Sequence, residues 1–315
     1  MMFLLAAVGY LMYKSGKITE EGSKALGNIL LYLSLPCVIV NSFLIERTPD
    51  RTAAFLISAL IALLALLLSM LVSRVMLKKN AIDIIAAAYS NAGFFGIPLT
   101  ATYLSSEAVF YIAPFIAFLN LFQWTYGVSL LKGSDKDGHL KKRERSNKIC
   151  SVADFKTRAG AIIKKVVTAP FMIAITIGCL IFFSGVSLPP IFAKSINHIA
   201  NLNTPVAMFT VGIYMAHTDI GKMFKRRRLY YVSLVRLIII PVLTILALSL
   251  ISNNMLDMKL AILIAAACPV GANVAVYAQL HNKEYSYAVE TVVISTILSI
   301  ISIPLMVAIG EALWI

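Results

Sequence analysis

The sequence predicts an all-α integral membrane protein with about ten transmembrane helices. Of its 315 residues, 59% are hydrophobic and only 14% are charged, and the mean hydropathy is +0.84. A soluble domain carries nearer a quarter of charged residues. Seven long segments contain no Asp, Glu, Lys or Arg, and each can cross a hydrocarbon core, which needs ~20 helical residues. These segments are Ala25–Ile45, Thr52–Ser73, Ile84–Ser106, Ala108–Leu131, Val166–Ala193, Ser195–Ala216 and Leu260–Leu280.

The apolar segments and their polar connections predict ten spans, with loops that alternate between the two sides of the membrane. Counted together with the basic residues at the adjoining span ends, the loops after the odd-numbered spans hold 23 Lys and Arg residues, and those after the even-numbered spans hold 4. Because basic loops stay in the cytoplasm, this asymmetry predicts that both termini lie outside. The predicted spans are residues 2–15, 25–45, 52–73, 82–104, 108–131, 167–187, 195–216, 228–252, 259–280 and 286–311.

The central loop at 132–166 divides the chain into a first five-helix unit, 1–131, and a second, 167–315. It carries 11 of the basic residues, and they explain much of the net charge of +13 without a nucleic-acid partner. The loop could bind anionic lipid headgroups, at ~1 kcal/mol per basic residue near the surface. It could equally be a solvated cytoplasmic linker that fixes the topology.

The two units carry weak internal similarity. Gly9–Gly16 and Gly178–Gly185 share Gly, Leu, Ser and Gly at an offset of 169, and Pro36 and Pro205 repeat that offset. Since each unit has an odd number of spans, the second enters the membrane from the opposite face. The sequence therefore predicts a 5+5 inverted-topology repeat, an architecture common among secondary transporters.

Helix-breaking residues cluster at the middle of spans 4 and 9. Glycine costs ~1 kcal/mol and proline ~3 kcal/mol in a helix interior. A helix broken at the midplane exposes backbone groups, and its second half presents an N-terminus with partial positive charge. The alternative is a packing kink, but paired breaks in matching spans favour a substrate site that receives an anion. The predicted substrate-binding residues are Asn91, Gly93, Gly96, Pro98, Pro269, Gly271 and Asn273.

The segment NAGFFGIP, from Asn91 to Pro98, closely resembles the fourth-helix motif of the auxin efflux carrier family. That family includes plant auxin exporters and bacterial permeases for malate or malonate. Ala266–Gln279, Asn203–Ala216 and Val235–Leu243 resemble its ninth, seventh and eighth helices. The resemblance implies crossing helices at a central site and a homodimer. It also implies an elevator-like motion, in which helices 3–5 and 8–10 slide against helices 1, 2, 6 and 7.

Other polar residues in the spans each allow more than one interpretation. Arg236 could serve as a counter-charge for an anion, pair with Glu290, or extend to the cytoplasmic edge. Glu290 could carry a coupling proton or be an interfacial end charge. Three polar amides could line a substrate cavity or simply bond to neighbouring helices. These amides are Asn41, Asn120 and Gln123.

We therefore expect a carrier of small organic anions in the cell membrane, with no catalytic residues, no metal and no cofactor. Expelling one negative charge from a cell that is negative inside releases ~2.3 kcal/mol per 100 mV. That is roughly 50-fold in concentration, so efflux needs no coupling ion. The main alternative is a non-transporting receptor or lipid sensor with a carrier-like fold. A membrane enzyme is disfavoured because no His, Asp and Glu cluster occurs in the spans.

Overall fold

The computed structural model describes residues 2–78, 80–133, 167–216, 223, 225–251, 255–280 and 283–315. Most of the predicted central loop therefore lies outside the described residues. The described residues are overwhelmingly helical and include one isolated antiparallel bridge, between Ser90 and Val270. Within these described ranges, five helices are long and apolar enough to cross a membrane: Glu20–Ser42, Pro49–Met76, Val109–Leu131, Arg227–Leu248 and Tyr285–Trp314.

Helices occupy each of the ten ranges expected from the sequence, so the all-α prediction is confirmed for the described residues. Several ranges contain more than one helical piece, and short π-helical segments (η) join some of the pieces. In chain order they are α1 (Met2–Lys14), α2 (Glu20–Ile29), η1 (Leu30–Ser34), α3 (Leu35–Ser42), α4 (Pro49–Met76), α5 (Ala81–Ala88), η2 (Ala92–Gly96), α6 (Ile97–Tyr103), α7 (Val109–Phe122), η3 (Gln123–Gly127), α8 (Val128–Gly133), α10 (Pro170–Ser184), α11 (Pro190–Ala200), α12 (Asn203–Ala216), α14 (Arg227–Leu234), η5 (Val235–Ile239), α15 (Ile240–Leu248), α16 (Leu256–Ala267), α17 (Asn273–Leu280) and α18 (Tyr285–Trp314).

Side-chain caps set where several helices begin. The Thr48 hydroxyl accepts a hydrogen bond from the Arg51 amide at the start of α4, and the Asn80 side chain accepts one from Ile82 at the start of α5. Thr19 caps α2 in the same way. The second helix therefore begins at Glu20, five residues before the predicted start. The prediction used the uncharged segment alone, whereas the capped first turn of the helix is polar and lies before that segment.

Three of the π-helical segments end two residues before a proline. The segments η1, η2 and η5 precede Pro36, Pro98 and Pro241. Proline has no amide hydrogen, and its ring clashes with the carbonyl four residues earlier. A wider turn relieves that clash while the chain remains helical. These prolines thus widen their helices, whereas the extended breaks lie elsewhere.

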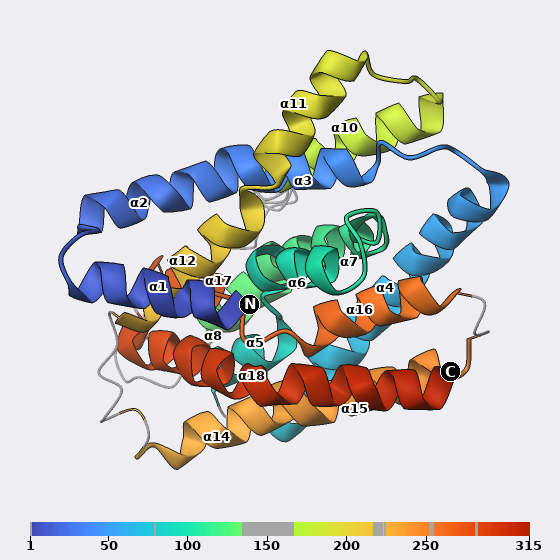
Figure 1. The fold of residues 1–315 in the computed structure, drawn as a ribbon. Coiled ribbons are helices and arrows are strands. Elements are labelled where there is room, and N and C mark those ends of the chain that lie inside the picture. The colour runs from blue at the N-terminus through green and yellow to red at the C-terminus, as the bar shows by residue number, and fades with distance from the viewer. Residues whose placement is uncertain are drawn as a thin grey trace, which may run out of the picture.

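The helices pack mainly in two groups. In the first group α1 packs on α12, and α3 packs on α10 and α11. In the second, α5 packs on α4, α14, α17 and α18, while α7 packs on α4 and α16, and α16 packs on α18. Figure 1 shows α2, α3, α10 and α11 on one side of the molecule and α14, α15 and α18 on the opposite side, with α5 to α7 between them. The groups meet where α3 and α10 touch α7 and where α12 touches η2 and α6.

An aromatic cluster joins the groups near the α3–α4 connection. The ring of Phe110 in α7 lies 5.0 Å from that of Phe43, 4.8 Å from Phe55 and 4.9 Å from Phe182, centroid to centroid. Both Phe43 and Phe110 are fully buried. Offset and edge-on aromatic pairs of this kind add about 0.5–1.5 kcal/mol beyond their buried area.

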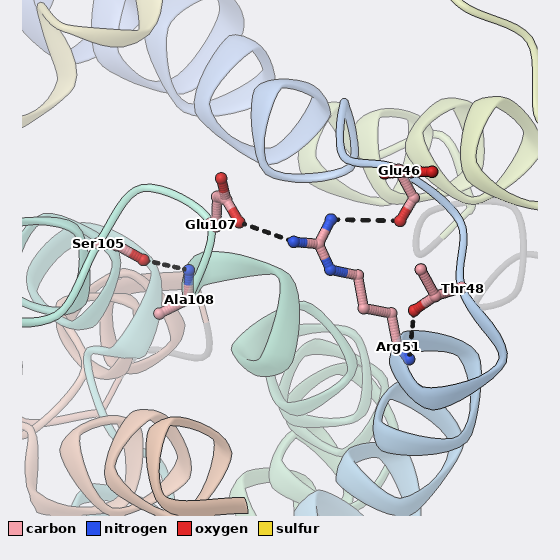
Figure 2. A network of polar contacts seen from close by, with 6 residues as sticks. All are labelled: Glu46, Thr48, Arg51, Ser105, Glu107 and Ala108. Atoms are coloured by element: carbon pink, nitrogen blue, oxygen red, sulfur yellow. Dashed lines mark hydrogen bonds and ion pairs between the residues drawn. The ribbon is translucent and has the colours of Figure 1, made fainter.

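A polar network lies beside this cluster (Figure 2). Arg51 donates through Nη1 to the Glu46 carbonyl at 3.2 Å, and its Nη2 lies 3.4 Å from the Glu107 carboxylate. The Ser105 hydroxyl accepts a hydrogen bond from the Ala108 amide at 3.1 Å, next to Glu107. Because Arg51 and Glu107 are both partly exposed, the ion pair contributes at most about 1 kcal/mol. It fixes the connection before α7 against the start of α4.

The contact between α1 and α12 depends on glycine. A Cβ atom on Gly212 would collide with the Ala6 backbone, and one on Gly9 would collide with the Phe209 backbone. We expect Gly212→Ala to destabilise the protein by about 1–3 kcal/mol, because neither backbone can give way without separating the helices. Thermal unfolding of the purified protein in detergent measures this. Gly27→Ala is the matched control, since nothing lies within 4 Å of that position. Unfolding of both variants at the wild-type temperature would contradict the close packing.

Candidate functional site

Two interrupted helices cross at the bridge between Ser90 and Val270. The Asn91 amide donates to the Pro269 carbonyl at 2.8 Å, and the Gly271 amide donates to the Tyr89 carbonyl at 3.0 Å. The segments 89–91 and 268–271 therefore lie side by side. One connects α5 to η2, and the other connects α16 to α17. The structure thus brings the two predicted breaks together as one crossover.

The local sequence explains why both helices stop there. Cys268 precedes Pro269, and the residue before a proline is driven out of the helical region; its backbone ψ is 150°. Gly271 allows the close approach, because a Cβ atom there would lie 3.2 Å from the Ser90 carbonyl oxygen. Gly96 allows a similar close approach, because a Cβ atom there would lie 3.2 Å from Cys268 Sγ.

Asn91 carries a free amide at the crossover. Its side chain is only 7% exposed and makes no hydrogen bond within the described part of the chain. Its carbonyl accepts from the Phe95 and Gly96 amides at 2.9 and 3.1 Å, so it stands at the first turn of η2. The hydroxyl of the adjacent Ser90 is also buried and has no described partner. Buried polar groups normally have partners, and these two have none among the described residues.

The second break is held by polar groups from neighbouring helices. The Asn273 amide donates to the Gln123 side-chain oxygen at 3.2 Å, and the Val270 amide donates to the Ser295 hydroxyl at 3.1 Å. The Tyr89 hydroxyl donates to the Phe122 carbonyl at 2.9 Å. Gln123 therefore bonds to Asn273 at the crossover, and its lining of a substrate cavity remains a prediction. Sequence patterns gave no signal for Ser90, Tyr89 or Ser295.

Arg236 lies next to the crossover, and its side chain is buried, with only 1% of its surface exposed. It donates to the Ala87, Ala88, Ala266 and Cys268 carbonyls. Its guanidinium thus bonds to carbonyls in the last turns of α5 and α16 and at Cys268, and it does not extend to an edge. Glu290 is instead ion-paired with Arg226, at 3.0 Å.

Two carboxylates form ion pairs beside the start of α14. Asp83 in α5 is buried, accepts from Arg228 Nε at 2.6 Å and accepts from the Tyr287 hydroxyl at 2.7 Å. A cavity of about 710 Å³ opens beside Asp83 and Arg228 at the end of α4. Glu290 lies on α18 and stays 9% exposed. These pairs join α5, α14 and α18; a role for Glu290 in proton coupling stays a prediction.

The remaining predicted residues are placed less directly. Asn120 donates to the Ile116 carbonyl of its own helix at 2.8 Å, one turn from Gln123. Asn41 lies half-buried near the end of α3, and no described hydrogen bond connects its side chain to the crossover. Gly93 lies in η2, where a Cβ atom would have no neighbour within 4 Å, and Pro98 lies at the start of α6. A cavity lining by Asn41 or Asn120 remains a prediction.

The comparisons with known proteins identify the family. The sequence profile of the family described as "Membrane transport protein" matches residues 1–307. The chain belongs to this membrane transport family. The resemblance to auxin efflux carriers is thereby confirmed, and with it a multi-pass membrane protein of the transporter class.

Two relatives from other organisms are similar over most of the chain. A Rhizobium meliloti protein named "Putative malonate transporter" is 22% identical over 306 residues, which cover 93% of this chain and 90% of the relative. An uncharacterised transporter of Methanocaldococcus jannaschii is 23% identical over 231 residues, which cover 68% of this chain and 67% of the relative. Both names describe transporters.

Proposed function

We propose that the protein is a secondary carrier of small organic carboxylates and that the crossover binds the carboxylate. The observation that carries this proposal is the unengaged set of donors there. The Asn91 side-chain amide has no hydrogen-bond partner among the described residues, and the first turn of η2 presents backbone N–H groups that have no carbonyl of their own helix to donate to. The N-terminus of α17 lies beside them, and its Val274 and Ala275 amides donate to the Gly271 and Ala272 carbonyls. Helix N-termini carry partial positive charge, so together these groups suit an anion.

Malonate is the first substrate to test, because one relative is named for it. Malate and indole-3-acetate extend the panel to a second dicarboxylate and to an auxin. The substrate class rests on the carboxylate, which all three share. The carbon skeleton is selected by side chains around the crossover, such as Gln123 and Tyr89.

The two packing groups supply a mechanism. We propose that the group containing the crossover slides against the group of α1–α3 and α10–α12 and carries the bound anion with it. In this proposal ten spans cross the membrane as a 5+5 inverted repeat, with both termini outside and the basic central loop in the cytoplasm. Efflux follows the membrane potential, at ~2.3 kcal/mol per charge per 100 mV. We further propose that two copies of the chain form a homodimer in the membrane and that its outer surface contacts lipid.

Counterflow in proteoliposomes tests the function. Vesicles preloaded with unlabelled malonate, malate or indole-3-acetate are given the same acid in labelled form. We expect saturable uptake of at least one acid, lost when the internal acid is replaced by a neutral amide. If monodisperse protein exchanges none of the three, the carrier proposal fails for this panel. Saturable binding without exchange would instead support a receptor with a carrier-like fold.

A further inference from the structure

The side chain of Arg236 donates hydrogen bonds to backbone carbonyls of both helices that end at the crossover. Its Nε donates to the Cys268 carbonyl at 3.1 Å, and its Nη1 donates to the Ala87 and Ala88 carbonyls at 2.9 and 3.3 Å. Its Nη2 donates to the Ala266 carbonyl. These oxygens belong to the last turns of α5 and α16, where four carbonyls of each helix lack helical partners. One side chain therefore donates to carbonyl groups at the C-terminal ends of both helices.

Every described partner of this guanidinium is neutral. Besides the carbonyls, Nη1 contacts the Ser69 hydroxyl at 3.3 Å, and Ser69 itself donates to the Ala88 carbonyl at 2.8 Å. The nearby acids are engaged elsewhere, Asp83 with Arg228 and Glu290 with Arg226. Arginine remains charged even when buried. In the described part of the chain, backbone dipoles therefore hold this positive charge, and no carboxylate neutralises it.

Simple charge addition shows the effect on the site. Each helix C-terminus carries about −0.5 of an elementary charge and each N-terminus about +0.5. Two of each meet at the crossover, so the helix ends alone sum to about zero. The positive charge of Arg236 cancels the two C-termini it contacts, which leaves about +1 on the N-terminal side. That remainder matches one carboxylate.

We propose that Arg236 is a resident cation of the crossover, which gives the site its anion preference without touching the anion. A ring of carbonyl oxygens is the kind of site that hard cations occupy. Here the guanidinium already fills it, so the protein needs no cation from either side of the membrane to hold the crossover together. The anion preference rests on the function proposed above; the closure of the carbonyl ring does not.

Chemical rescue of Arg236→Ala tests the closure in detergent, without any transport. We expect this variant to unfold about 5–10 °C below the wild type, because the Ala87, Ala266 and Cys268 carbonyls lose the side chain that donates to them. Guanidinium at about 20 mM should restore at least half of the loss by binding the vacated ring. Urea at the same concentration has the same shape but no charge, and it should restore nothing. Sodium chloride controls for ionic strength.

Arg47→Ala is the matched control, because Arg47 also donates to a carbonyl, that of Phe183, but is exposed. It should unfold near the wild-type temperature and gain nothing from guanidinium. Unfolding of Arg236→Ala at the wild-type temperature, or equal rescue by urea, would overturn the resident-cation role. If the alanine variant is not recovered folded, Arg236→Lys replaces it, with a smaller loss and rescue again expected from guanidinium only.

The anion preference has its own measurement in the same samples. For the wild type, malonate should raise the unfolding temperature, whereas malonamide should not. The malonate shift should vanish in Arg236→Ala and return with guanidinium. A malonate shift that persists in Arg236→Ala without guanidinium would overturn the electrostatic role. If the wild type shows no shift with any acid of the panel, the proposed function fails, while the rescue of stability still decides the closure.

Discussion

Asn91→Ala is expected to lower kcat/KM for carboxylate exchange by about 10- to 150-fold while leaving the protein as stable as the wild type. A hydrogen bond to a charged group contributes about 1.5–3 kcal/mol, and each 1.4 kcal/mol is tenfold. Stability is spared because the Asn91 side chain makes no described hydrogen bond that the substitution could break. Initial rates of counterflow measure the change in kcat/KM, and thermal unfolding measures the change in stability.

Asn201→Ala is the control for this prediction, since Asn201 is an exposed amide at the end of α11. It should keep wild-type exchange and stability. If Asn91→Ala exchanges at the wild-type rate, the crossover amide does not bind the substrate. If Asn91→Ala is strongly destabilised, the amide is structural, and our reading of its free state is wrong.

Gly271→Val is expected to abolish exchange and to cost about 1–3 kcal/mol of stability or more. A Cβ at Gly271 already lies 3.2 Å from the Ser90 carbonyl and 3.4 Å from the Tyr89 carbonyl. Both are backbone atoms of the bridge, so they cannot move aside without breaking its hydrogen bonds. Branching at Cβ adds two methyl groups to a space where the first carbon is already tightly packed.

Gly93→Ala is the matched control for steric effects, because nothing lies within 4 Å of that position although it belongs to the same crossover. It should unfold at the wild-type temperature. Measuring both variants in one thermal-unfolding series shows whether the stability loss of Gly271→Val comes from the close approach at that position. Equal destabilisation of both variants would show that glycine is required for backbone flexibility rather than for close approach.

The sequence patterns were sufficient to locate the crossover but not to describe its support. Clusters of Gly, Pro and Asn mark both breaks because these residues weaken helices wherever they stand. The support comes from Ser69, Ser295 and Arg236, which lie far from the breaks in sequence and show no local pattern. A buried arginine can be recognised as costly from sequence, but its carbonyl partners depend on how α5, α14 and α16 pack.

Other differences between the predicted spans and the observed helices also have local causes. The seventh predicted span is divided into α11 and α12 near Asn201, although it contains no charged residue. Apolarity measures membrane compatibility and is insensitive to such a division. Likewise, Pro36 and Pro241 widen their helices into π turns, whereas Pro269 ends one. Proline alone does not distinguish these outcomes, which depend on the residues that can satisfy the freed backbone groups.

The central claim, that the anion occupies the crossover, is tested most directly by substrate protection of a cysteine placed there. Gly93→Cys, in a background where Cys37, Cys150, Cys179 and Cys268 are replaced by alanine, is treated with a membrane-impermeant thiol reagent in proteoliposomes. We expect malonate to slow modification in proportion to its occupancy, and malonamide to have no effect. An unchanged modification rate under conditions where malonate exchange runs at full speed would show that the anion binds elsewhere.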